Sequence, residues 1–422
     1  MAPQNTSLPR VVSTTEFTIL IAFLMSIVAI SIDALLPALG IVGKELQLAD
    51  PNKAQYIISS LFLGMAIGQL ICGPLSDATG RKKILYAGIL LFMLGSVICF
   101  FADNLSVMLL GRFIQGLGVS GPYVSAISIV RDQYSGRQMA RVMSLVMMIF
   151  IMVPALAPTL GQTILLFASW RYIFAFYIIY SLIIACWIFF RLTETLPKEK
   201  RIPFTVTSFI AGFKEVVSHR ITMGYTVCMG LFFGSFIGYL NSSQQIFQVQ
   251  FNTGKLFSLY FGLLALVFGI SSLANSRFVE RLGMHYICTR SVLYIIGSSA
   301  IFLGLHWVVD IQLWIFLIYA TILFFCFGLM FGNLNAIAME PMGHVAGIAS
   351  AIIGSISSIL SMILGTLIGQ LYNNTLIPVA TGFLLLGIIS LMIMRLVDKS
   401  VDKSADKTLD KSVSEEQGEI TS

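Results

Sequence analysis

Asp33 is a carboxylate placed well inside a long apolar stretch, residues 17–42. An unpaired charge at the centre of a lipid-embedded helix costs about 2.5–3.5 kcal/mol on insertion scales, and such groups tend to lie on proton or ion pathways. Loss of water disfavours the charged form of a carboxyl group. Asp33 is therefore predicted to take up and release a proton near neutral pH. A carboxylate held permanently by a structural hydrogen bond is the alternative.

Arg112 is the charged residue best placed to act with Asp33. It lies seven residues into the apolar stretch 105–130, whereas Asp33 lies nine residues before residue 42. The first stretch ends on the side of the membrane where the fourth begins. At ~1.5 Å per residue, Asp33 and Arg112 therefore both lie roughly 10–14 Å from that side. The two charges are predicted to meet or to compete for a partner. In the alternative, Arg112 only holds helices together.

Further polar side chains within apolar stretches are candidates to line a cavity. Polar groups inside a membrane either face a ligand or hydrogen-bond between helices. The sequence leaves both roles open, because it does not fix the rotation of each helix about its own axis. The candidates are Gln115, Tyr123, Asn241, Gln245 and Asn335.

Composition requires that lipid, rather than water, surrounds most of this chain. Of its 422 residues, 57% are hydrophobic and 11% are charged, whereas soluble domains carry about 25% charged residues. Only helices and closed barrels satisfy their backbone groups in lipid, and the apolar stretches have the ~20 residues that a membrane-spanning helix needs. The sequence thus predicts an all-α membrane protein with spans near 17–42, 54–75, 84–102, 105–130, 142–164, 170–190, 221–247, 256–276, 286–306, 311–338, 345–370 and 376–396.

Basic residues gather on one side of these predicted spans. Lys and Arg are enriched in cytoplasmic loops of membrane proteins. They cluster at 81–83, 131–141, 191–220 and 277–281 and in the C-terminal tail, and are sparse in the opposite loops. Both termini and the central segment are therefore predicted to be cytoplasmic, although the loop 339–344 carries no Lys or Arg.

The chain is predicted to consist of two similar halves. A pattern at 73–80, G-x-L-x-D-x-x-G, is matched 203 residues later by S-x-F-x-E-x-x-G at 276–283, as in transporters built from two parallel repeats. The predicted parts are a cytoplasmic N-terminus (1–16), a six-helix half (17–190), a cytoplasmic central loop (191–220), a second six-helix half (221–396) and a tail (397–422). The tail repeats Asp-Lys-Ser with few apolar residues and is predicted to be disordered.

Charged and small residues also gather at the predicted cytoplasmic ends of spans 2 to 4. Glycines there allow close packing and a tight turn. Plain membrane anchoring accounts for the basic residues but not for a carboxylate in the same loop. Charge pairs in this cluster are predicted to latch one conformation; its members are Gly73, Asp77, Gly80, Arg81, Arg131 and Asp132.

Several of these segments resemble one family of membrane proteins. GPLSDATGRKK at 73–83 and GRFIQG at 111–116 resemble two signature motifs of the major facilitator superfamily. DALLPAL at 33–39, ETLP at 194–197 and EPMGHVAGIASA at 340–351 are similar to segments of its bicyclomycin and chloramphenicol resistance branch, a group of drug:proton antiporters with twelve spans. The resemblance extends from about residue 17 to 396.

This resemblance implies a secondary active transporter that works by alternating access in the bacterial inner membrane. Its expected partners are a small amphipathic or apolar substrate, such as a drug or self-made metabolite, together with protons and the lipid bilayer. Export in exchange for protons is expected, with Asp33 and Arg112 in proton coupling and the 73–83 loop as a gate. A proton-coupled uptake symporter of the same fold is the alternative. A monomer is expected.

The fifth span carries Pro154, Pro158 and Gly161. The two prolines remove helical hydrogen-bond donors one turn apart. The pattern resembles the antiporter motif of the family's fifth helix but departs from it, because Ala157 precedes Pro158 where the family has Gly, and Gln162 follows Gly161. Both departures weaken the inference of antiport.

The sequence does not show the residues that other functional classes require. No catalytic nucleophile, cofactor motif or metal-ligand cluster is recognisable, the four histidines are scattered, and the six cysteines lack disulfide or zinc spacing. The absence of a G-x-x-x-x-G-K-[S/T] loop argues against direct use of ATP. The net charge of +6 lies in short loops and is not a nucleic-acid signal. We therefore expect neither an enzyme nor a cofactor, metal or nucleic-acid partner.

Overall fold

The computed structural model describes residues 13–134, 136–201 and 205–420. Within that part of the chain, twelve helical segments are long and apolar enough to cross a membrane, which confirms the predicted number of spans. The helices are α1 (Thr14–Asp33), η1 (Leu36–Ala38), α2 (Leu39–Glu45), η2 (Pro51–Gln55), α3 (Tyr56–Thr79), α4 (Arg81–Phe100), α5 (Leu105–Gln133), α6 (Gly136–Phe167), α7 (Arg171–Arg191), η3 (Lys198–Lys200), α8 (Val206–Ser218), α9 (Arg220–Gln244), η4 (Gln245–Gln250), η5 (Gly254–Leu256), α10 (Phe257–Leu282), α11 (Met284–His306), α12 (Leu313–Met339), η6 (Glu340–Val345), α13 (Ala346–Gln370) and α14 (Ile377–Ile420).

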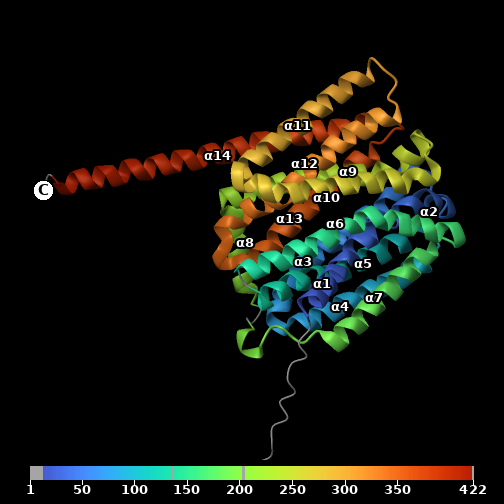
Figure 1. The fold of residues 1–422 in the computed structure, drawn as a ribbon, viewed down its shortest axis with the longest axis horizontal. Helices are drawn as coiled ribbons and strands as arrows, with labels where there is room; N and C mark the ends of the chain where they lie inside the picture. Colours follow the sequence, from blue (N-terminus) through green and yellow to red (C-terminus); the bar gives the residue numbers. More distant parts are fainter. Residues whose placement is uncertain (1–12, 135, 202–204, 421–422) are drawn as a thin grey trace, which may run out of the picture.

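The spans form two six-helix halves that pack side by side. Helices α1 to α7 make the N-terminal half and α9 to α14 the C-terminal half, and α8 lies between them in sequence (Figure 1). The halves meet chiefly where α3 packs on α13 and α6 packs on α10. We call the end of the bundle that carries Arg81 and Arg191 the basic end, and the end that carries Asn52 and Tyr372 the opposite end.

The N-terminal half is held together by backbone-to-backbone contact between α3 and α5. A Cβ atom added at Gly116 would lie 2.1 Å from the carbonyl oxygen of Leu61, and one added at Gly64 would lie 2.1 Å from that of Phe113. In lipid, helices gain no hydrophobic free energy from pairing, so close packing of small residues is what holds them together.

The first span is not one continuous helix. It breaks after Asp33 and resumes as η1 and α2, because Pro37 has no N–H group and its ring would clash with the carbonyl of residue 33 in a regular helix. Gly161 of α6 packs directly on this break, and a Cβ there would lie 1.9 Å from the carbonyl oxygen of Ala34. Asp33 thus lies at a bend that a neighbouring helix holds in place.

The last helix differs from the disordered tail that the sequence predicts. Helix α14 continues through the Asp-Lys-Ser repeat to Ile420 and stands out from the bundle, at the red end of the ribbon (Figure 1). The repeat contains no proline and no glycine before Gly418, so nothing in its backbone ends the helix that the membrane span begins.

Gly116→Ala is expected to lower the midpoint of thermal unfolding of the detergent-purified protein. The added methyl group must push α3 and α5 apart, and overpacking of this kind typically costs about 1–3 kcal/mol. Gly297→Ala is the matched control, because its added Cβ has no atom within 4 Å. Equal midpoints for the two variants would contradict this packing.

Candidate functional site

Asp33 lies buried at the break in the first span, with 6% of its surface exposed. Within the described part of the chain its carboxylate has no hydrogen bond and no ion pair. The break that carries Asp33 packs against α6 of its own half through Gly161 and, through η1, against α9 of the opposite half. Asp33 therefore lies beside a contact between the two halves.

Arg112 is fully buried and is bound by backbone carbonyls rather than by Asp33. Its Nε donates to the carbonyl of Ile57 at 3.0 Å, and its Nη1 donates to the carbonyl of Ser31 at 3.0 Å and to Oε1 of Gln115 at 2.8 Å. These contacts join α5 to α1 and α3. The two carbonyl contacts fit the role in holding helices together that the sequence left as an alternative.

The break after Asp33 explains how a carbonyl of α1 is available to Arg112. The regular helix ends two residues after Ser31, and the Ser31 carbonyl accepts from both Arg112 and Oη of Tyr177, the latter at 3.4 Å. Within the described residues, Nη2 of Arg112 is buried without a partner. Arg112 thus binds the last turn of α1, two residues before Asp33, and keeps part of its hydrogen-bonding capacity unused.

A set of neutral polar side chains closes the opposite end between the two halves; we call it the amide seal. The Gln55 side chain donates to Gln245 at 2.7 Å, Gln245 donates to Asn52 at 2.8 Å, and Asn241 donates to Ser59 at 3.4 Å. Further hydrogen bonds in the seal come from Asn52 to the carbonyls of Gln370 and Tyr372, from Gln370 to the carbonyl of Asn52, and from Thr366 to Ser59.

The cavity candidates are thus distributed over several environments. Asn241 and Gln245 belong to the amide seal. Gln115 is fully buried inside the N-terminal half, where its amide also donates to Ser96 at 2.7 Å. Tyr123 is half-buried, and Asn335 is exposed. Within the described part of the chain, Asn241 and Gln245 are the two of these five that hydrogen-bond across the halves.

The charge cluster at the basic end is centred on Arg81. Its guanidinium pairs with Asp77 at 2.5 Å and with Asp132 at 2.9 Å, which joins α3, α4 and α5. Gly80 has φ +105°, a conformation that favours glycine, and it separates α3 from α4. Gly73 packs against Ala351 of α13, a Cβ at Gly73 lying 3.4 Å from that of Ala351.

Two features extend this cluster. The Glu194 carboxylate accepts from the backbone N–H groups of Arg81 at 3.0 Å and Lys82 at 3.2 Å, so it caps the start of α4. Asp77 also lies against the start of α13, where a Cβ on Gly347 would be 3.1 Å from Oδ2 of Asp77; the N-terminus of a helix favours a carboxylate. Arg131, which the sequence included in the cluster, is exposed.

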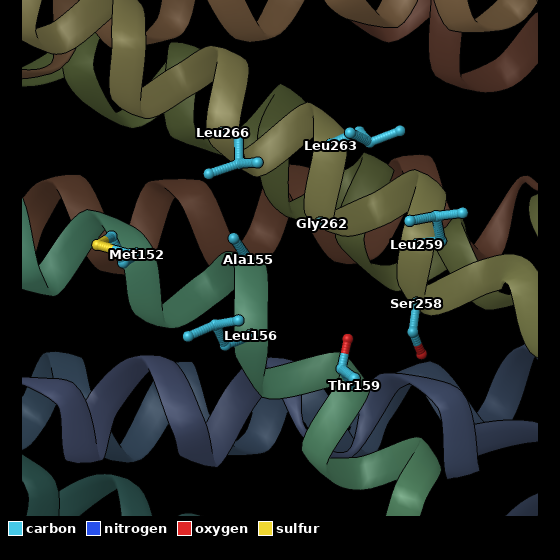
Figure 2. A pocket seen from close by; sticks show the side chains of 9 residues that line it. All are labelled: Met152, Ala155, Leu156, Thr159, Ser258, Leu259, Gly262, Leu263 and Leu266. Atoms are coloured by element: carbon cyan, nitrogen blue, oxygen red, sulfur yellow. The ribbon is translucent and has the colours of Figure 1, made fainter.

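Helix α6 carries the two prolines into the contact with α10. The carbonyl of Pro158 accepts from Ser258 at 3.1 Å, and a Cβ on Gly262 would lie 2.8 Å from the carbonyl of Ala155. Pro154 lies one turn earlier on the same helix. An apolar groove follows this crossing, and Figure 2 shows the side chains that line it: Met152, Ala155, Leu156, Thr159, Ser258, Leu259, Gly262, Leu263 and Leu266.

Sequence reasoning missed several residues that complete these sites. Tyr177 and Tyr239 were not distinguished from the other aromatic residues, and Asn52, Gln55 and Gln370 were not recognised as a seal. The signal for the last three was present in the sequence, because each is an amide at the same end of a predicted span. No signal in the sequence distinguishes Tyr177 and Tyr239 from the other aromatic residues, since aromatic residues are frequent throughout the spans.

Arg112→Lys is expected to lower the thermal unfolding midpoint by several degrees. A lysine ammonium cannot reproduce the fork that binds two carbonyls and Gln115, and a lost hydrogen bond to a charged group costs about 1.5–3 kcal/mol. Arg277→Lys, at an exposed position of α10, is the control and should leave the midpoint unchanged. A stable Arg112→Lys protein would show that the buried carbonyl contacts are dispensable.

Comparisons with known proteins agree with this architecture. The chain is 31% identical over 344 residues to the uncharacterized MFS-type transporter YdgK of Bacillus subtilis, covering 79% of this chain and 84% of that protein. It is 27% identical over 367 residues to a bicyclomycin resistance protein homolog of Haemophilus influenzae, covering 87% and 92%. The solved peptide transporter POT superposes with a TM-score of 0.72 at 13% identity, covering 94% of this chain and 97% of that one.

The family model described as Major Facilitator Superfamily matches residues 19–366. That range runs from the first span into α13 and includes Asp33, Arg112, the cluster at Arg81 and most of the amide seal. This chain is therefore a transporter rather than an enzyme, and it belongs to the Major Facilitator Superfamily.

Proposed function

We propose that this transporter exports small apolar or amphipathic compounds from bacteria in exchange for protons. The observation that carries the proposal is Asp33, a buried carboxylate that has no hydrogen-bond or ion-pair partner among the described residues and lies at a break whose η1 segment contacts α9 of the other half. A bare carboxylate in an apolar interior is costly. The carrier should therefore change conformation readily when Asp33 is protonated or when substrate is bound. It should change conformation poorly when Asp33 is ionised and no substrate is bound.

This dependence of the conformational change on Asp33 is sufficient to exchange substrate for protons. If substrate and proton both act on Asp33, binding of one promotes release of the other, and each is carried on a different half of the cycle. Arg112 contributes by holding the break of α1 in place through the Ser31 carbonyl, with its unused Nη2 available to a nearby negative charge. No step in this scheme requires a metal ion, a nucleotide or a cofactor.

We further propose that the basic end faces the cytoplasm of the inner membrane and the amide seal faces outward. The distribution of Lys and Arg supports this orientation, because basic loops remain on the cytoplasmic side. In the conformation described, the seal is closed by hydrogen bonds between the halves. Transport then requires these bonds to break so that the site can open outward.

Relatives support export over uptake. Besides the bicyclomycin resistance protein homolog, the chain is 28% identical over 321 residues to the multidrug resistance protein MdtL of Shigella dysenteriae, covering 74% of this chain and 79% of that protein. Resistance to a drug follows from its removal, not its uptake. The departures at Ala157 and Gln162 from the antiporter pattern of α6 make direction the first property to test.

Asp33→Asn is expected to abolish uphill transport without abolishing binding. The amide fixes a neutral group of nearly constant volume, so no proton remains to be exchanged. A pH difference of one unit supports about a tenfold substrate gradient for one proton per neutral molecule, since one unit is worth about 1.36 kcal/mol. Everted vesicles with an acidic interior should accumulate bicyclomycin about tenfold with the wild type and only to equilibrium with the variant.

Arg277→Lys serves again as the control and should accumulate bicyclomycin like the wild type. Uphill accumulation by Asp33→Asn would place the coupling carboxylate elsewhere, with Glu340 and Glu16 as the next candidates. Accumulation by right-side-out vesicles instead of everted ones would establish the uptake symporter. If neither orientation moves bicyclomycin, the same comparison is run with a panel of drugs and exported metabolites.

Cross-linking the amide seal is expected to stop transport. Asn52→Cys and Tyr372→Cys place thiols on the two halves where the Asn52 side chain now donates to the Tyr372 carbonyl at 2.9 Å. In a cysteine-free background, a membrane-impermeant bifunctional thiol reagent added to intact cells should join them and block efflux. A reducible reagent should allow recovery.

A single Lys214→Cys on α8, at the proposed cytoplasmic face, is the orientation control. It should escape the impermeant reagent in intact cells and react in everted vesicles. Labelling at position 214 from outside would reverse the proposed orientation, and efflux that continues with the seal fully cross-linked would contradict the proposed opening.

A further inference from the structure

Helix α8 carries a row of apolar side chains that its neighbours leave uncovered. Val206 is 64% exposed, Ile210 59%, Phe213 43% and Val217 38%. These residues are four, three and four positions apart, the spacing that brings side chains onto one face of a helix. We call these four residues the apolar stripe. Single exposed apolar residues are common on proteins, whereas a continuous apolar surface marks contact with a membrane or a partner.

The rest of α8 is divided between a packed face and a mostly polar face. A Cβ on Gly212 would lie 2.8 Å from Cγ2 of Ile348 on α13, and Val216, one turn later, is fully buried. The third face consists of exposed residues: Thr207, Ala211, Lys214 and Ser218. At about 100° per residue, the three faces lie roughly 100–150° apart around the helix. The apolar stripe is therefore separate both from the bundle and from the polar face.

Helix α8 lies where the spans leave the bilayer. Helix α7 ends at Arg191 and α9 begins at Arg220, so the chain enters and leaves α8 at the basic end, where Figure 1 shows it. Ile348 lies in the first turn of α13 and follows Gly347, beside which Asp77 of the charge cluster lies. The 13 residues of α8 extend about 20 Å, too short to cross a hydrocarbon core of ~30 Å. Helix α8 is thus at the level of the membrane surface.

Lipid is the partner present at this level. On α14, Leu396 is 70% exposed, and its neighbour Val397 packs on the second turn of α9, where a Cβ on Gly224 would lie 2.5 Å from Cγ2 of Val397. The lipid-facing surface of the spans thus continues to the turns at which they leave the bundle. The main packing partners of α8 are α13 and α9, both in the C-terminal half, and neither covers the stripe. Acyl chains are the apolar material that reaches it.

The charges around the stripe match an anionic membrane surface. Lys214 directly follows Phe213 and is exposed, so its apolar stem can lie along lipid while its ammonium reaches the headgroups. From residue 198 to 220 the chain carries five basic and two acidic residues: Lys198, Lys200, Arg201, Lys214 and Arg220 against Glu199 and Glu215. A helix with an apolar face and basic flanks binds at the interface of anionic membranes.

We propose that α8 is a membrane-surface helix: its apolar stripe inserts among the acyl chains of the leaflet at the basic end, and the basic residues around it contact anionic headgroups. This inference depends neither on the proposed proton exchange nor on the side of the membrane that the basic end faces. Since α13 and α9 both belong to the C-terminal half, α8 anchors that half, and not the other, to the leaflet.

Fluorescence quenching of the full-length protein in lipid nanodiscs tests this placement without any transport assay. In a cysteine-free background, Phe213→Cys carries a fluorophore on the stripe. Ala211→Cys carries it two residues away, on nearly the opposite side of the helix. The discs contain phosphatidylcholine and phosphatidylglycerol, with a nitroxide on some acyl chains. The nitroxide should quench the label at 213 severalfold more strongly than the label at 211, and iodide in the buffer should give the reverse order.

Varying the phosphatidylglycerol content tests the headgroup contact. In the labelled Phe213→Cys protein, Lys214→Gln should raise the phosphatidylglycerol fraction needed for half of the maximal acyl-chain quenching, because one charge that draws α8 to the surface is lost. Lys255→Gln, exposed on η5 at the opposite end, is the matched control and should leave that fraction unchanged. Equal curves for the two variants, or full quenching without phosphatidylglycerol, would overturn the headgroup contact.

Two other results would overturn the placement of the stripe. If iodide reaches the label at 213 as readily as the label at 211, the stripe faces water. If neither quencher reaches 213, protein covers the stripe, either the other half or a second copy of the chain. Size-exclusion profiles and thermal midpoints identify a Phe213→Cys protein that fails to fold, in which case Ile210→Cys on the same stripe replaces it. None of these readings uses proton exchange, so this inference and the proposed function fail separately.

Discussion

The guanidinium of Arg112 is a permanent charge that is fully buried, and the N-terminal half is arranged to supply its hydrogen-bond acceptors. Three acceptors reach it from three places: the Ser31 carbonyl on α1, the Ile57 carbonyl on α3 and the Gln115 amide on its own helix. The bend that Pro37 imposes on the first span lies beside the Ser31 carbonyl, and Gly161 of α6 holds that bend in place. The same bend positions Asp33. The position of the residue proposed to exchange protons therefore depends on the hydrogen bonds that Arg112 makes.

Arg112 also explains why Asp33 can remain unpaired. Had the two residues formed an ion pair, removing either charge would leave the other buried alone, at a cost of 3–5 kcal/mol in typical proteins. A carboxylate locked in such a pair would exchange its proton poorly. With Arg112 bound by the carbonyls of Ser31 and Ile57 and by Gln115, the Asp33 carboxylate remains available to a proton or a substrate in the proposed exchange.

Much of the fold could be predicted from the sequence, because long apolar stretches in a lipid solvent have one secondary structure. The twelve spans and the six-plus-six division are confirmed. That Arg112 reaches the part of the first span around Asp33 could also be predicted, since both were expected at similar depth from residue count. Which way each side chain points could not be, because rotation about a helix axis depends on packing against partners. For this reason Gln115 and Asn241, both predicted to line a cavity, lie in different environments. Gln115 is enclosed within the N-terminal half, and Asn241 belongs to the amide seal.

The two ends of the bundle are held together by different chemistry, and the difference fits the tasks proposed for them. At the basic end, Arg81, Asp77 and Asp132 form ion pairs within one half, so they can persist while the halves move. At the seal, the hydrogen bonds between the halves are formed by neutral amides and hydroxyls, and in the proposed cycle they break each time the site opens outward. Each such hydrogen bond contributes about 0.5–1.5 kcal/mol net. A ligand shifts a conformational equilibrium only by its differential affinity for the two states. As the seal opens, water can replace some of its weak neutral hydrogen bonds. The binding free energy of one proton or one small substrate is therefore sufficient to shift the equilibrium toward the open seal, whereas it would not be sufficient to separate buried ion pairs between the halves.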